Sequence, residues 1–163
     1  MTQSDWVPLP KPLVVDSGAG ETVMPSDWLP AHPVTESAGS KNNEYYTTAD
    51  GSKVYNEGQR SVFVSTLDGN QERAMTFQVA QVHKALGSVS QMVRNGNTLV
   101  FDTDEYGRDV SYILNKKTQD YIPMRVENGV YVIDVVVAPP GYHPLQKYNT
   151  GKNSSNWGFP RQG

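Results

Sequence analysis

Cysteine is absent from the 163 residues of this chain, which excludes disulfide frameworks and cysteine-ligated zinc sites. Histidine is scarce as well. His32, His83 and His143 lie far apart in the sequence and have no carboxylates at ligand spacing. We therefore expect no metal site.

An excess of charge of one sign and long hydrophobic runs are also missing. The chain has 14 basic and 17 acidic residues, and no basic run exceeds Lys116-Lys117, so we expect no direct binding to nucleic acid. No apolar run approaches the length of a membrane span, so we expect no membrane partner. The polar, proline-rich N-terminus lacks the apolar segment of a signal peptide. These absences favour a soluble intracellular protein of the cytoplasm, or a piece of a longer polyprotein.

Proline and glycine are plentiful, with 11 and 14 residues, and they mark the expected boundaries. Residues 1–11 contain prolines that block a helix, which predicts an extended lead-in. Residues 12–137 hold the apolar and β-favouring segments and are long enough for one domain with its own core. Residues 138–163, rich in Pro, Gly, Ser and Asn, are expected to form a tail or linker. Within the domain, residues 25–43 predict a long irregular connection.

The middle of the chain is typical of β-structure. Residues 44–58 have β-favouring residues on both sides of Asp50-Gly51, which predicts a hairpin with a two-residue turn. Residues 60–82 repeat this pattern around a longer turn. In residues 75–80, Met75, Phe77 and Val79 alternate with Thr76, Gln78 and Ala80, with the period of a half-buried strand. Further strands are expected at residues 98–102, 109–115 and 129–137.

One short helix interrupts this pattern. Ser88 can cap its start, Val89, Met92 and Val93 at i, i+3 and i+4 are expected on one face, and Asn95-Gly96 can end it. With a single short helix among many strands, the expected fold class is all-β.

An acidic residue follows directly on the first apolar run, where Asp16 precedes Ser17-Gly18-Ala19. A carboxylate is costly at the end of a buried strand, so its position needs a reason. One reason is a turn, because Asp, Ser and Gly favour turns. Another is a catalytic site. The glycine spacing does not match a phosphate-binding loop, and no pattern places a histidine to activate Ser17.

Three segments carry a more specific pattern: VVDSGAGETVMP at 14–25, TTADGSKVYNEGQRSVFV at 47–64 and ALGSVSQMVRNGNTLVF at 85–101. In the last, an apolar pair precedes Gly87 and the expected helix. In this order the segments resemble the retropepsin-like aspartic proteases, the single-lobe enzymes of retroviruses and retrotransposons. The resemblance covers residues 9 to 102 and at its widest extends to residue 137.

The resemblance implies a single-lobe acid-protease β-barrel with one short helix and a flap hairpin. It implies an aspartic endopeptidase of retroelement polyprotein processing, in which Asp16 is catalytic. Two neighbouring carboxylates share one proton, so that one is the base for a water and the other the acid for the carbonyl oxygen. Because the chain has one Asp-Ser-Gly motif, the resemblance implies a homodimer that pairs Asp16 with its symmetry mate.

The same resemblance implies roles for further residues. The active-site loop would be supported by Ser17, Gly18 and Ala19, the flap over the substrate would be formed by Ala49, Asp50 and Gly51, and Leu86 and Gly87 would support the loop from behind. The implied substrate is an extended peptide or polyprotein segment, and no cofactor is implied.

Two other functions stay open on the sequence alone. The chain can be a catalytically inactive dimerisation or peptide-binding module that keeps the same fold. It can also be a small β-barrel binding domain of unrelated descent, in which Asp16 is a turn residue. The expected flap lacks the glycine-rich tip of many viral enzymes, and Gly20 stands where relatives often carry a polar residue.

Overall fold

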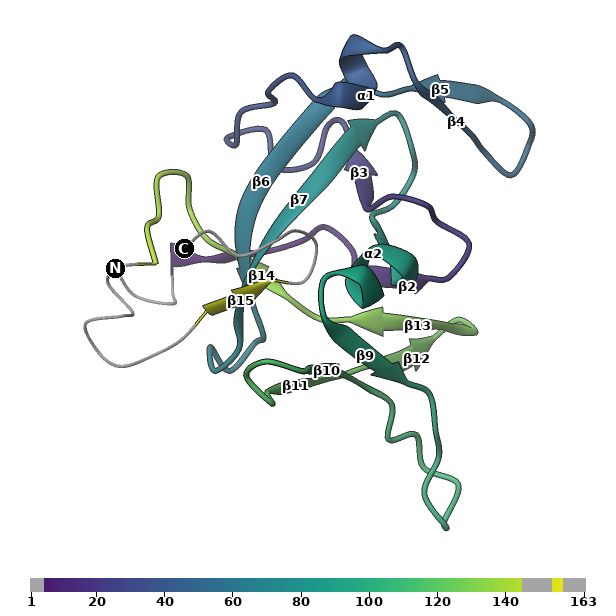
Figure 1. The fold of residues 1–163 in the computed structure, drawn as a ribbon, viewed down its shortest axis with the longest axis vertical. Helices are drawn as coiled ribbons and strands as arrows, with labels where there is room; N and C mark the ends of the chain where they lie inside the picture. Colours follow the sequence, from purple (N-terminus) through teal and green to yellow (C-terminus); the bar gives the residue numbers. More distant parts are fainter. Residues whose placement is uncertain (1–4, 145–153, 157–163) are drawn as a thin grey trace.

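A computed structural model describes residues 5–144 and the backbone of residues 154–156. It consists mostly of β-strands, so the expected all-β class is confirmed. The main sheet has ten strands and curls into a half-barrel (Figure 1). Among the described residues, no helix is long and apolar enough to cross a membrane.

The strands of the main sheet, in spatial order, are β1 (Val7–Pro8), β14 (Val136–Val137), β6 (Gly58–Ser65), β7 (Glu72–Ala80), β3 (Val23–Pro25), β8 (Leu86–Ser88), β2 (Leu13–Asp16), β13 (Val130–Ile133) and β12 (Arg125–Glu127), with β15 (Ser154–Asn156) also paired to β7. A three-stranded sheet consists of β9 (Asn97–Val100), β10 (Tyr112–Asn115) and β11 (Tyr121–Pro123), and a hairpin of β4 (Tyr45–Thr47) and β5 (Lys53–Tyr55) stands apart. The helices are α1 (Ala38–Lys41) and α2 (Val89–Arg94).

The long antiparallel pair β6–β7 forms the centre of the sheet. Along β7 the side chains of Met75, Phe77 and Val79 are fully buried, whereas Thr76 and Gln78 between them are only half-buried. This is the period of two that the sequence predicts, and it places the apolar face of the strand against the core.

Strand β2 is covered on both edges, because it pairs in parallel with β8 and antiparallel with β13. Leu13, Val14 and Val15 are all buried as well, so both faces of the strand are covered, which accounts for the unbroken apolar run in the sequence. The strand ends at Asp16, where the chain leaves the sheet.

The described residues contain two helices, where the sequence predicts one. Helix α2 begins after Ser88 and ends at Asn95 as expected. Helix α1 lies inside the connection 25–43, so the prediction of a wholly irregular connection is wrong. It is a single turn in which the hydroxyl groups of Ser37 and Ser40 cap each other's backbone, and it is too short to show an apolar period.

The strand expected at 129–137 is instead two strands. Residues 134 and 135 separate them, because β13 pairs with β2 whereas β14 pairs with β6, far from β2 in the strand order. Strand β10 begins at Tyr112, later than predicted, since the Asp109 carboxylate accepts a hydrogen bond from the Ser111 backbone N–H and holds a turn there. Strands β11 and β12 were not predicted.

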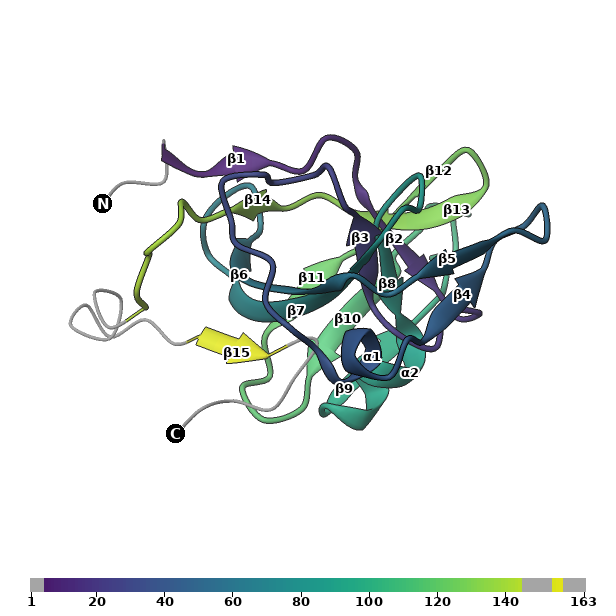
Figure 2. The ribbon, with the colours of Figure 1, turned by 90° about the horizontal axis from the view of Figure 1, so that it is seen from above.

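The two ends of the described chain meet on the sheet. Strand β1 pairs with β14, and the ring of Trp6 packs edge-on against Tyr142 with their centroids 5.0 Å apart. Figure 2 shows this pair of strands on the side of the molecule away from the β4–β5 hairpin. Most of the expected tail, residues 145–153 and 157–163, lies outside the described residues.

Candidate active site

Asp16 stands at the end of β2, with Ser88 of β8 as its neighbour in the parallel ladder. Its Oδ1 accepts a hydrogen bond from the backbone N–H of Gly18 at 2.8 Å, and its carbonyl accepts one from the N–H of Ala19 at 3.4 Å. The chain therefore turns immediately after the buried strand. This turn leaves the Asp16 side chain partly exposed, with Ser17 and Gly18 exposed beside it.

The loop after Asp16 is fastened to the start of α2. The Ser88 hydroxyl donates to the Ala19 carbonyl at 2.7 Å and accepts from the Gln91 backbone N–H at 3.2 Å. The side chain of Gln91 in turn accepts from the Thr22 backbone N–H at 3.0 Å. The sequence identifies Ser88 as a helix cap, but its second contact, and the contribution of Gln91 and Thr22, come from tertiary packing.

Gly87 lies where β8 passes behind β2. A Cβ atom at this position would come 2.7 Å from the Cε atom of Met92 and 3.5 Å from the carbonyl oxygen of Val14. A side chain here would force the end of Met92 to shift, so a glycine suits this close approach of β8 and α2. Leu86, next to it, is half-buried and points into the cleft described below.

The β4–β5 hairpin has a three-residue turn, so the prediction of a two-residue turn is wrong. The Thr48 N–H donates to the Ser52 carbonyl, and the Gly51 N–H donates to the Thr48 carbonyl, both at 2.9 Å. Gly51 takes a left-handed φ of 86°, the usual end of a three-residue loop. The Asp50 carboxylate accepts from the Thr48 hydroxyl and the Ser52 N–H, which lowers the pKa of Asp50 to about 2.

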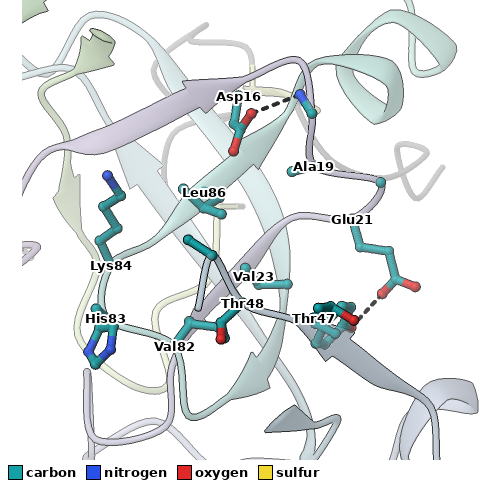
Figure 3. A pocket seen from close by; sticks show the side chains of 14 residues that line it. Asp16, Ala19, Glu21, Val23, Thr47, Thr48, Val82, His83, Lys84 and Leu86 are labelled. Atoms are coloured by element: carbon teal, nitrogen blue, oxygen red, sulfur yellow. Dashed lines mark hydrogen bonds between the residues drawn. The ribbon is translucent and has the colours of Figure 1, made fainter. Parts of the chain in front are cut away.

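The loop, the hairpin and the chain before β8 together line an open cleft of about 500 Å³. Figure 3 shows Asp16 on one side of it, Thr47 and Thr48 on the other, and Val23 and Leu86 between them. Of the residues named from the sequence, the lining includes Asp16, Gly18, Ala19, Ala49 and Leu86, whereas Ser17, Asp50, Gly51 and Gly87 lie outside it.

Charged side chains flank the cleft at both ends (Figure 3). Lys84 and His83 are exposed on one flank, and Glu21 lies on the other. The Tyr46 hydroxyl donates a hydrogen bond to Glu21 Oε2 at 2.9 Å. Burial of the ring, and then the neighbouring carboxylate of Glu21, raise the pKa of Tyr46 above its ordinary value. Sequence reasoning missed these four residues, because no local pattern brings them together.

The described part of the chain holds no group of three or more His, Asp or Glu side chains arranged to bind a metal ion. Comparisons with models of protein families, with curated proteins and with solved structures found no match to this chain.

Proposed function

We propose that this chain is an aspartic endopeptidase of the retropepsin-like type that acts as a homodimer. The observation that carries the proposal is the position of Asp16. Its carboxylate follows a fully paired strand, lies in an open cleft, and faces a hairpin on the opposite wall. If Asp16 were only a turn residue, nothing would require it to lie in a cleft opposite a hairpin.

The second carboxylate comes from another copy of the chain, since the Asp-Ser-Gly motif occurs once in the sequence. A two-fold axis beside the exposed Ser17 and Gly18 brings the two Asp16 side chains together. Because two close carboxylates cannot both ionise comfortably, they hold one proton between them.

Hydrolysis then proceeds by proton transfer through this pair. The ionised carboxylate takes a proton from a water, whose oxygen attacks the peptide carbonyl carbon, while the protonated carboxyl gives its proton to the carbonyl oxygen. When the tetrahedral intermediate collapses, the C–N bond breaks and the leaving nitrogen takes a proton from the pair. The products are a carboxylic acid and an amine.

The substrate we propose is an extended segment of a retroelement polyprotein. Such a peptide fits between the hairpin and the loop that follows Asp16, with its backbone bound by hydrogen bonds and alternate side chains in pockets. The apolar side chains of Val23, Val82 and Leu86 line the cleft and favour an apolar side chain near the cleaved bond.

The test is cleavage of a peptide library at mildly acidic pH, with and without an inhibitor that mimics the tetrahedral intermediate. The parent is compared with Asp16→Asn and with Asp27→Asn, a matched change at an exposed aspartate outside the cleft. We expect the parent and Asp27→Asn to cleave, and Asp16→Asn to lose about 10³-fold or more in rate. A parent that binds peptides and dimerises without cleaving them is instead the inactive binding module.

A further inference from the structure

Four polar side chains form a chain of hydrogen bonds from the central sheet to the rim of the cleft. Asn56 Nδ2 donates to Gln78 Oε1 of β7 at 2.8 Å and to the Tyr46 hydroxyl at 2.9 Å. The Tyr46 hydroxyl donates onward to Glu21 Oε2 at 2.9 Å. Tyr46 belongs to the hairpin and Glu21 to the loop that follows Asp16, so this series of hydrogen bonds joins the two walls of the cleft.

Asn56 is the fixed end of this connection. Its side chain is buried, and its Oδ1 accepts from the Gly58 backbone N–H at 2.9 Å and from the Ser37 hydroxyl at 3.0 Å. Its own backbone N–H donates to the Glu44 carbonyl at 2.8 Å. With both ends of the amide bound, the orientation of the amide is fixed, and so is the place at which Tyr46 is held.

The outer part of the hairpin has little else to hold it. Its two strands pair with each other in a separate two-stranded sheet, and such an isolated hairpin is marginally stable in water. Tyr45 and Tyr55, which contact each other edge-on, are about half exposed. The side chain of Tyr46 points the other way, toward the cleft, and is half-buried.

The hydroxyl of Tyr46 is suited to a permanent contact. Burial and the Glu21 carboxylate hold its pKa above the ordinary value, which favours the protonated hydroxyl that donates this hydrogen bond. The acceptor is a carboxylate, and hydrogen bonds to charged groups are stronger than those between neutral groups. Next to Glu21, the backbone of Thr22 is bound by Gln91, so this wall is held in place as well.

We propose that Tyr46 is a positioning residue of the cleft: its hydroxyl, held between Asn56 and Glu21, sets the position of the hairpin relative to Asp16. An extended peptide then enters a cleft whose width is already set. Because the hairpin is ordered before the peptide binds, the free energy of peptide binding does not include the cost of ordering it. The consequence for catalysis rests on the proposed function, whereas the contact between hairpin and loop does not.

Hydrogen exchange tests the contact directly. Tyr46→Phe removes the hydroxyl and keeps the ring, and Tyr45→Phe is the matched control on the exposed face of the same strand. We expect the amides of residues 47–53 to exchange about tenfold faster in Tyr46→Phe than in the parent. The control should match the parent, and Glu21→Gln, which keeps an acceptor oxygen, should stay closer to the parent than Glu21→Ala. Equal exchange in the two tyrosine variants overturns the proposal.

Kinetics test the consequence. We expect Tyr46→Phe to raise KM about tenfold and to change kcat by less than about threefold, since the hydroxyl acts on binding and not on the reacting atoms. The double variant Tyr46→Phe with Glu21→Ala should be no worse than Tyr46→Phe alone, because Tyr46→Phe already removes the contact with Glu21. Additive losses overturn the proposal. If the parent cleaves no peptide, the proposed function fails, and the exchange experiment still decides on the contact.

Discussion

Asp16 is bound differently from the aspartates of the two hairpin turns, Asp50 and Asp68. Asp50 and Asp68 each accept from a threonine hydroxyl two residues earlier and from a backbone N–H two residues later, and these bonds hold the pKa of both carboxyls below the usual range. A carboxylate held ionised in this way is a poor carrier of a proton. Asp16 also accepts from the backbone N–H two residues later, that of Gly18, but no threonine lies two residues before it.

Ser17 gives a prediction at this scale. In the proposed dimer its exposed hydroxyl bonds to the partner's loop, so Ser17→Ala removes two symmetry-related hydrogen bonds at once. At about 1 kcal/mol each, we expect the dissociation constant of the dimer to rise about 30-fold, as measured by analytical ultracentrifugation. The cleavage rate of the saturated dimer should fall as well. Ser61→Ala, on the exposed face of β6, is the control and should leave the dissociation constant unchanged. An unchanged dimer in Ser17→Ala would contradict this role.

Asp50 gives a prediction for pH. Its pKa is about 2 in the folded hairpin against 3.8 ordinarily, chiefly because the Thr48 hydroxyl donates to it. A lowered pKa means that the ionised form favours the folded turn, so its contribution is present above about pH 4 and is lost as the pH falls toward 2. The hairpin should therefore keep its turn at the mildly acidic pH of the proposed reaction. Carboxyl carbon chemical shifts should place the titration of Asp50 near pH 2. A midpoint near 4 would contradict the turn geometry.

At the scale of elements, the sequence predicts those strands, helices and turns that depend on interactions between residues close together in the chain. The alternation along β7, the cap and end of α2, and the two hairpins all depend on neighbours a few residues away, and each appears in the structure. The short helix α1 and the choice between a two- and a three-residue turn at Asp50-Gly51 depend on single hydrogen bonds that composition does not reveal.

Long-range pairing decides the rest. The segment 129–137 is nearly all apolar and predicts one strand, but the strand is interrupted at residues 134–135, because β13 and β14 have different partners. The cleft also depends on contacts between segments that lie far apart in the sequence. Asp16, Ala49 and Leu86 belong to three separate segments of the sequence, and the fold brings them to one cleft. The contact of Tyr46 with Glu21 links residues with no shared motif, so the sequence alone could not predict it.

Gly87 gives the prediction at the scale of elements. Gly87→Ala adds a methyl group that meets the Met92 Cε atom at 2.7 Å, in a core where Met92 is almost fully buried. We expect overpacking to lower the free energy of unfolding by about 1–3 kcal/mol, as measured by denaturant titration. Adding Met92→Leu, which lacks the Cε atom, should recover part of this loss. If Gly87→Ala is as stable as the parent, β8 and α2 do not pack as closely as described.

At the scale of the whole molecule, the proposed function makes a single chain half of an enzyme. Asp16, the hairpin and the support from α2 are all present once in the chain, and the missing component is a second carboxylate. Activity must then depend on the concentration of dimer and not on the concentration of chains. This dependence distinguishes the proposal from a monomeric hydrolase, whatever the substrate is.

Mixing the parent with Asp16→Asn measures this dependence. Asp16→Asn changes one atom of the side chain and should still dimerise, so after exchange of subunits an equal mixture contains parent, mixed and variant dimers in the ratio 1:2:1. If both carboxylates are needed, the mixture keeps about one quarter of the activity of the parent at the same total concentration. If one chain is sufficient, it keeps about one half. The experiment is run well above the dissociation constant of the dimer, with Asp27→Asn as the mixing control that should cause no loss, and a result near one half contradicts the shared site.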